Sequence, residues 1–303
     1  MLTCGIVLAL LVIPREVIWS YCAGGAAFAI GPAAVFLSDK WRTARGFDKL
    51  ILFGPVFYAA PLAAFGAEHF TLTAGMVSMV PAWIPWHSFW VYLVGACFIA
   101  ASLSLATGIQ TRLAASLLSL TFFIFAAVMD APAWAQDPRD RFATALMLRE
   151  IAFSGGALAL AGSLAGPQHR RQAHVLAAVA RYFVAVPILF YSFEQFLHAE
   201  HVPGVPLQAV TPTWIYGHSI WTYLTAVVYA VAGALLLSGI KTRAAATGLG
   251  VILLVVILAV YIPIGAAERD SLDNGLNYLG DTLMFCGAVL LLAGAMPHSR
   301  RAA

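Results

Sequence analysis

The residue with the clearest chemical potential in this 303-residue chain is Glu194. It lies about twelve residues into the apolar stretch that follows Arg181, or ~18 Å along a helix axis. A carboxylate at that depth costs several kcal/mol unless it is paired or protonated. His198 and His201 follow at i+4 and i+7, so the three side chains would share one face if the helix continued. Such a stripe would relay protons; the alternative is a protonated Glu194 that is hydrogen-bonded to neighbouring backbone.

A second set of polar and aromatic residues recurs at the start of two apolar stretches. His87 and His218 begin these stretches, and Trp90 and Trp221 lie three residues further on, on the same helical face. We take as candidate catalytic residues Glu194, His198, His201 and His218, and as candidate cofactor-binding residues His69, His87, Trp83, Trp90, Trp214 and Trp221. Two alternatives stay open, because tryptophans also anchor helices at a membrane interface and histidines there also serve as ordinary polar residues.

The sequence lacks the motifs of a metal site, of covalently attached haem, of a phosphate-binding loop and of a nucleophilic serine. Glu194, His198 and His201 have suitable ligand types, but no His-Glu-x-x-His pattern occurs, so no metal site is predicted. The four cysteines show no Cys-x-x-Cys spacing, and the absence of Cys-x-x-Cys-His excludes covalently attached haem. Gly-rich phosphate loops and a Gly-x-Ser-x-Gly elbow are absent as well.

The composition places these residues in a membrane. Apolar residues make up 61% of the chain and charged residues 10%, with a mean hydropathy of +0.86, whereas soluble domains carry about 25% charged residues. The net charge of +3 is too small to indicate a nucleic-acid partner. Nine spans are predicted, over residues 17–37, 48–66, 88–108, 113–130, 146–165, 175–198, 219–239, 244–263 and 277–296.

The basic residues predict the topology. Twelve of the seventeen lie at alternate connections, from Lys40 to Arg301, and the opposite connections carry mostly acids. By the positive-inside rule the basic side, including the C-terminus, is cytoplasmic, and the protein is a multi-pass protein of the plasma membrane. The apolar stretch Met1–Ile13 is short and has no basic leader, so we expect an interfacial segment or a lead-in to the first span.

An internal repeat organises the spans. Residues 81–112 and 212–243 match at fourteen of thirty-two positions without a gap, at an offset of 131. Pro132 and Glu150 meet Pro263 and Asp281 at the same offset. We therefore predict an all-α polytopic membrane protein with two parallel four-helix transmembrane repeats plus one extra N-terminal helix. The predicted domains are residues 1–46, the first repeat at 47–167 and the second at 174–298.

These motifs resemble the DoxX-like (DoxX and DoxD) membrane proteins. That family is built from four-span units with a Gly-x-x-His-Phe-like turn, an outer loop rich in proline and aromatic residues, and a basic small-residue turn inside. The matching segments are residues 66–70, 81–90 and 108–112, and again residues 199–201, 212–221 and 239–243. The resemblance implies a link to membrane quinones, as in the DoxD-type subunits of thiosulfate:quinone oxidoreductase. The first repeat departs from the second, because Leu62 stands where Glu194 would be expected.

Three functions follow from this reading. The first is a quinone-interacting redox subunit or accessory component of a respiratory or other oxidoreductase complex, with electrons supplied by a partner or by a thiol or sulfur substrate. The second is a non-catalytic structural or assembly subunit of a larger membrane complex, and the third is a transporter of a small solute or lipid. Whether the protein is itself an enzyme stays open. The expected partners are the lipid bilayer and other membrane or redox subunits.

Overall fold

The computed structural model describes residues 14–297 except residue 206. Nine helical segments within this part are long and apolar enough to cross a membrane: Val17–Leu37, Phe47–Thr71, His87–Thr107, Thr111–Gln136, Arg141–Ser163, Pro167–Leu197, His218–Ser238, Thr242–Ala267 and Leu272–Ala295. The predicted class, an all-α polytopic membrane protein, is confirmed. The Met1–Ile13 stretch and Arg301 lie outside the described residues.

The helices fall into one leading helix and two sets of four. The leading helix is α2 (Arg15–Leu37). The first set comprises α5 (Gly54–Thr71), α7 (His87–Thr107), α8 (Thr111–Phe125) with its extensions η1 (Ala126–Asp130) and α9 (Ala131–Gln136), and α10 (Arg141–Ser163). The second comprises α11 (Arg170–Leu197), α12 (His218–Ser238), α13 (Thr242–Val256) with η3 (Ile257–Tyr261) and α14 (Ile262–Ala267), and η4 (Leu272–Asn277) with α15 (Tyr278–Ala295).

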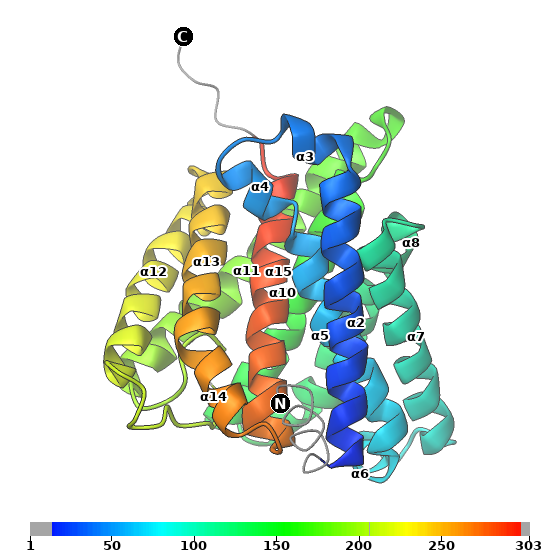
Figure 1. Ribbon diagram of the computed structural model, residues 1–303, viewed down its shortest axis with the longest axis vertical. Coiled ribbons are helices and arrows are strands. Elements are labelled where there is room, and N and C mark those ends of the chain that lie inside the picture. The colour runs from blue at the N-terminus through cyan, green and yellow to red at the C-terminus, as the bar shows by residue number, and fades with distance from the viewer. Residues whose placement is uncertain (1–13, 206, 298–303) are drawn as a thin grey trace, which may run out of the picture.

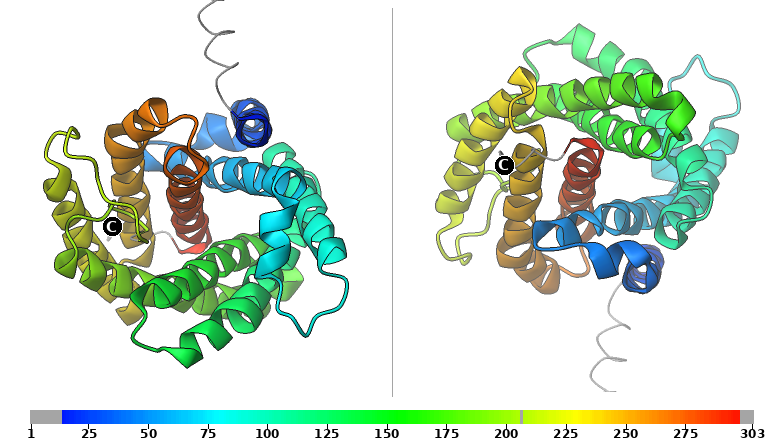
Figure 2. Two further views of the ribbon diagram at one scale, coloured as in Figure 1. Left: turned by 90° about the horizontal axis from the view of Figure 1, so that it is seen from below. Right: turned by 90° about the horizontal axis from the view of Figure 1, so that it is seen from above.

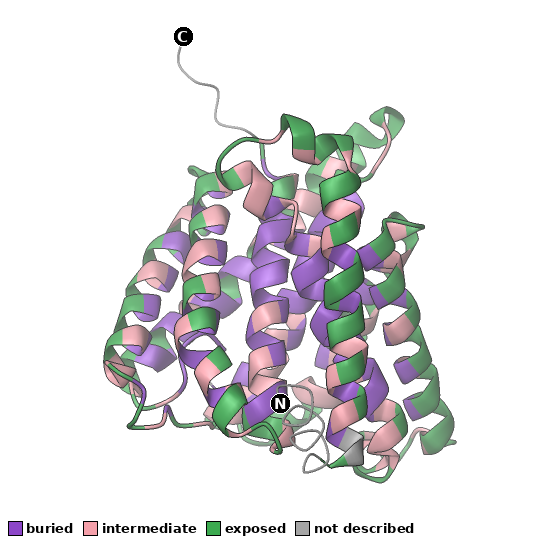
Figure 3. Ribbon diagram, in the orientation of Figure 1, coloured by how far each residue is buried: buried purple, intermediate pink, exposed green. Residues whose placement is uncertain are grey.

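The helices of the two sets are joined in a ring of contacts, and α15 lies at the centre of the molecule with the other helices around it (Figure 2). Each helix packs on the next, α15 packs back on α5, and α10 packs on α15 between the two sets. The packing of α5 on α7 and of α8 on α10 is repeated by α11 on α12 and by α13 on α15. Figure 3 shows α5 and α15 as largely buried and α2 as largely exposed, and α2 packs outside the ring on α5 and α7.

The backbone itself repeats at the offset of 131 residues. Six of the eight described residues with a positive φ angle form pairs at this offset: Trp86 with Gly217, Gly108 with Gly239, and Gln110 with Lys241. The π-helical turns η1 and η3 are also one offset apart, and each is followed by a proline, Pro132 or Pro263. A proline inside a helix lacks an N–H and clashes with the preceding turn, which favours such a widened turn. The domain boundaries themselves stay a prediction, but this is the backbone that a duplicated module would give.

Two equivalent glycines allow the central helices to approach closely. A Cβ atom on Gly156 of α10 would lie 2.5 Å from Ala288 of α15, and one on Gly287 of α15 would lie 2.5 Å from the backbone nitrogen of Tyr58 in α5. Small residues at such crossings are typical of helices packed within membranes. One continuous core, which includes Tyr58, Tyr191 and Phe285, therefore joins the two sets.

The connections separate into two ends (Figure 1). The upper end carries the short helices α3 (Asp39–Thr43) and α4 (Phe47–Ile51) and the connection to α11 through η2 (Pro167–His169). The lower end carries α6 (Thr73–Met79), the loop of residues 199–217 and α14. Both α5 and α11 run from the upper end to the lower end, so the two sets have the same orientation in the molecule.

Candidate functional site

Glu194 does not lie on a continuous helical stripe with the two histidines. Helix α11 ends at Leu197, and His198 is its C-terminal cap with a non-helical backbone. Glu194 is three residues from this end, and its buried carboxylate pairs with the Nε of Arg141 at 2.5 Å. Arg141 also donates to the backbone oxygen of Leu207. Because the helix ends before His198, the three side chains do not form the stripe that a continuous helix would give, and Glu194 instead orients an arginine that contacts the loop 199–217.

The candidate tryptophans lie at the surface of the lower end. Trp83 is 74% exposed and Trp214 is 54% exposed. The indole N–H of Trp90 donates to the backbone oxygen of Pro85, and that of Trp221 donates to Tyr216 at the equivalent place in the second repeat. These indoles are bonded to their own loops, so the geometry favours the alternative that they anchor the helices at a membrane interface.

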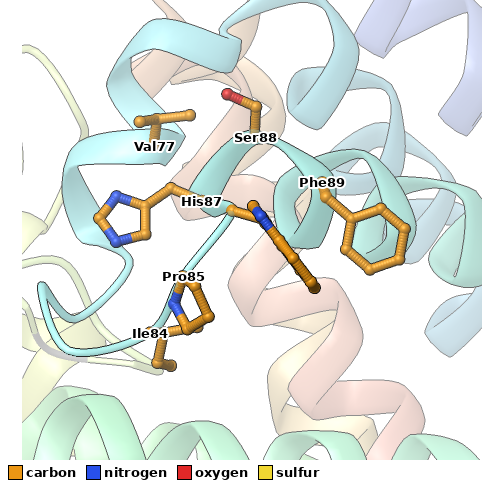
Figure 4. A pocket seen from close by; sticks show the side chains of 7 residues that line it. Val77, Ile84, Pro85, His87, Ser88 and Phe89 are labelled. Carbon is orange, nitrogen blue, oxygen red and sulfur yellow. The ribbon is translucent and has the colours of Figure 1, made fainter.

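Three candidate histidines are dispersed over the same end. The Nδ1 of His69 lies 2.7 Å from the backbone oxygen of Phe65, and its ring contacts Phe98 edge-on. His218 begins α12 and is half-buried. His87 begins α7 and lines an open hollow of about 830 Å³ together with Val77, Ile84, Pro85, Trp86, Ser88 and Phe89. In Figure 4 its ring lies between Val77 and the Ile84–Pro85 turn. The candidate quinone-binding residues thus share no single cavity in the described part of the chain.

His198 and His201 do come together, around Glu200 rather than Glu194. The Nδ1 of His198 lies 3.4 Å from the Oε1 of Glu200, and the Nδ1 of His201 lies 3.7 Å from the same oxygen. Burial, and then the charge of Arg141, lower the pKa of His201. The pKa of Glu200 is lowered chiefly by a hydrogen bond from its own backbone, with a smaller contribution from the two imidazoles. At neutral pH this cluster therefore offers a carboxylate and neutral imidazole nitrogen.

A buried ionic centre lies between the two repeats. Arg149 of α10 donates from Nη2 to Glu150 and from Nη1 to Asp281 of α15, both at 2.8 Å. Glu150 and Asp281 are one repeat offset apart, so matching positions supply the two carboxylates. Arg149 lies eight residues into α10, about 12 Å from its lower end.

Further acids surround this centre. Glu68 of α5 interacts electrostatically with Asp281, and Asp130 of η1 interacts with Arg149 and Glu150. Glu68 Oε1, Asp130 Oδ2 and Glu150 Oε2 are buried and accept no hydrogen bond from a described residue. Within the described chain, Arg149 interacts with three of these carboxyl groups, Glu150, Asp281 and Asp130, and Glu68 interacts with Asp281. The sequence signal that could have revealed this centre is the pairing of Glu150 with Asp281, two acids at matching positions of apolar spans.

The excess of acids over cations determines what the centre can do. Unpaired carboxylates in a medium of low polarity are costly, so such groups take up protons or cations. Arg149 compensates one carboxylate in full, and the remaining carboxyl groups can be neutral only by holding a proton or a cation. The centre is therefore a place where a proton can bind and leave within the bilayer.

No family model, no curated protein and no solved structure matches this chain.

Proposed function

We propose that this multi-pass membrane protein exchanges protons with the lower side of the membrane through its buried acidic centre, as a subunit of a DoxX-like redox complex. The observation that carries the proposal is the charge imbalance of the centre: four carboxyl groups interact with one another between two packed repeats, and one arginine, Arg149, interacts with three of them. Ionisable groups inside a membrane are expensive, and they characteristically belong to ion pathways and proton relays.

The acids are graded in depth. Glu68 lies three residues from the lower end of α5, or about 5 Å along the axis, and Asp130 lies six residues from the lower end of α9. Glu150 and Asp281 lie deeper, each about 13 Å from the start of its span. This order provides successive proton sites from the lower surface to Arg149. The positive-inside rule makes that surface extracytoplasmic.

Infrared difference spectroscopy of the protein in lipid nanodiscs tests this proposal. Between mildly acidic and mildly basic pH, the wild type should lose the C=O stretch of a protonated carboxyl group, and Glu68→Gln or Glu150→Gln should reduce that signal. The matched control is Glu194→Gln, because Glu194 is equally buried and pairs with Arg141, whereas Glu150 and Asp281 share Arg149 and Glu68 Oε1 has no hydrogen-bond partner among the described residues. If no protonated carboxyl is detected, or if the three variants behave alike, the centre holds no exchangeable proton and a non-catalytic structural role is favoured.

The hollow beside His87 supports a second function, the binding of a membrane quinone at the lower surface. Its walls are mainly apolar, and His87 is the ring donor or acceptor that could meet a quinone oxygen. When bound, a quinone would accept electrons from a partner subunit or a thiol or sulfur compound. In this chain His87 would orient the head group, and Trp86 and Pro85 would cover it.

Lipid extraction from the purified protein tests the quinone proposal separately. A bound quinone should be lost in His87→Ala and retained in His218→Ala, the equivalent histidine of the second repeat, which does not line the hollow. Equal quinone content in both variants, or none in the wild type, would contradict a site at His87.

A further inference from the structure

The loop that follows α11 brings three metal-ligand side chains within four residues. We propose that His198, Glu200 and His201 form a binding site for one divalent transition-metal ion, with Zn²⁺ as the best match. This site is separate from the buried acidic centre, and its failure would leave the proposed function untouched.

The distances fit a first coordination shell. Two ligand atoms at about 2.0–2.1 Å from a tetrahedral Zn²⁺ are about 3.4 Å apart. The Oε1 of Glu200 lies 3.4 Å and 3.7 Å from the Nδ1 atoms of His198 and His201, and one ligand atom from each of the three residues lies within 4.8 Å of the others. Small rotations of the imidazole rings therefore suffice to place a cation between them.

The Nδ1 of His201 gives an independent indication. It is buried and makes no hydrogen bond with any described residue. A buried polar atom without a partner is costly, and a metal ion would satisfy it. The nearby charge of Arg141 opposes a cation, but Arg141 is paired with Glu194 at 2.5 Å.

The backbone of the site is fixed before any ion binds. The backbone N–H of His201 donates to His198, and the N–H of Thr211 donates to Glu200. The hydroxyl of Thr222 in α12 donates to the backbone oxygen of His201. Ligands held by such supporting hydrogen bonds lose little freedom on binding.

The donor set determines the class of ion. Two imidazoles and one carboxylate suit Zn²⁺ and its neighbours, whereas Mg²⁺ and Ca²⁺ prefer sites made of oxygen. The side chain of Glu200 is 56% exposed, so a fourth position is open to water. Three protein ligands with an open position characterise exchangeable or catalytic zinc sites rather than closed structural ones. The first repeat has Gly66 where the second has His198, so the site belongs to the second repeat alone.

Competition between the metal-free full-length protein and a chromophoric chelator measures Zn²⁺ binding. We expect one Zn²⁺ per chain, and at least about tenfold weaker binding in His198→Ala and in Glu200→Gln. Co²⁺ in place of Zn²⁺ should give the visible absorption of a tetrahedral nitrogen–oxygen site. His218→Ala is the matched control, because it removes a half-buried histidine from the same end outside the cluster.

Two results would overturn the metal site. One is a wild type that binds Zn²⁺ no more tightly than the triple variant His198→Ala/Glu200→Gln/His201→Ala; the other is an equal loss in the control. Because Glu200 is exposed, Glu200→Gln should fold even if a histidine variant does not, which keeps the measurement decisive.

Discussion

Arg149 lies between two carboxylates from matching positions of the two repeats. Its nitrogen atoms are 2.8 Å from Glu150 and 2.8 Å from Asp281, and both acids are buried. A buried ion pair need not add stability over an apolar pair, but removal of one partner leaves an uncompensated charge. Removal of Arg149 should therefore lower the free energy of unfolding more than removal of either acid.

Arg149→Met should destabilise the protein by about 3–5 kcal/mol unless the acids take up protons. Asp281→Asn should cost less, about 1–3 kcal/mol, because Glu150 still compensates Arg149. Unfolding in mixed micelles at several pH values measures both. Below neutral pH the cost of Arg149→Met should shrink as the carboxyl groups are protonated, and a cost that does not change with pH would contradict the account.

Zn²⁺ binding at His198, Glu200 and His201 should weaken as the pH falls. Protons compete with the metal for each ligand. Because the pKa of His201 and that of Glu200 are both lowered, these two ligands stay deprotonated to a more acidic pH than free imidazole or free carboxyl would. Affinity should therefore hold at neutral pH and decline below it, by about tenfold per pH unit for each proton taken up. Chelator competition at several pH values checks this, and binding that strengthens on acidification would be inconsistent with the site.

Individual residues were the least predictable feature of the sequence. The sequence marks Glu194 and the histidines as unusual in an apolar stretch, but their partners Arg141 and Glu200 are set by tertiary packing and by the end of α11. No glycine or proline at residue 198 marks that end, so the sequence favoured a continuous helix. Whether the candidate residues act in catalysis stays a prediction.

At the scale of elements, hydropathy predicts each span because a bilayer requires a minimum apolar length. The helix ends shift by a few residues: the span predicted at 48–66 continues to Thr71, and the one predicted from 146 begins at Arg141. Charged residues such as Glu68 and Arg141 lie at those ends. The local hydropathy therefore falls while the backbone is still helical. Hydropathy does not predict the π turns beside Pro132 and Pro263, although these prolines occupy matching positions of the repeat.

Helix packing at Gly287 provides a test at this scale. Gly287→Ala places a Cβ 2.5 Å from the backbone nitrogen of Tyr58 and 2.9 Å from the carbonyl carbon of Phe57. Backbone atoms cannot rotate away, so α5 and α15 must separate, at a cost of roughly 1–3 kcal/mol. Gly248→Ala is the control, because its Cβ would meet nothing within 4 Å. Thermal unfolding in detergent measures both variants; equal stability would refute the close crossing.

At the scale of the molecule, duplication explains why the polar groups gather as they do. Two modules with the same orientation place α6 and the loop 199–217 at one end, and they bring the last helix of each module together at the centre. The sequence predicted this arrangement through its 131-residue offset. The ring of contacts that joins the two sets of helices was not predicted, because an internal repeat does not determine how its two copies pack against each other.

The parallel arrangement is the claim on which the rest depends, and cysteine accessibility tests it most directly. In a cysteine-free background, Ala82→Cys and Thr213→Cys are exposed, equivalent positions at the lower end, and Thr107→Cys and Ser238→Cys are their counterparts at the upper end. An impermeant thiol reagent applied to intact cells should label the first pair and leave the second pair unlabelled until the membrane is opened. Labelling of Ala82→Cys and Thr213→Cys from opposite sides would contradict the account.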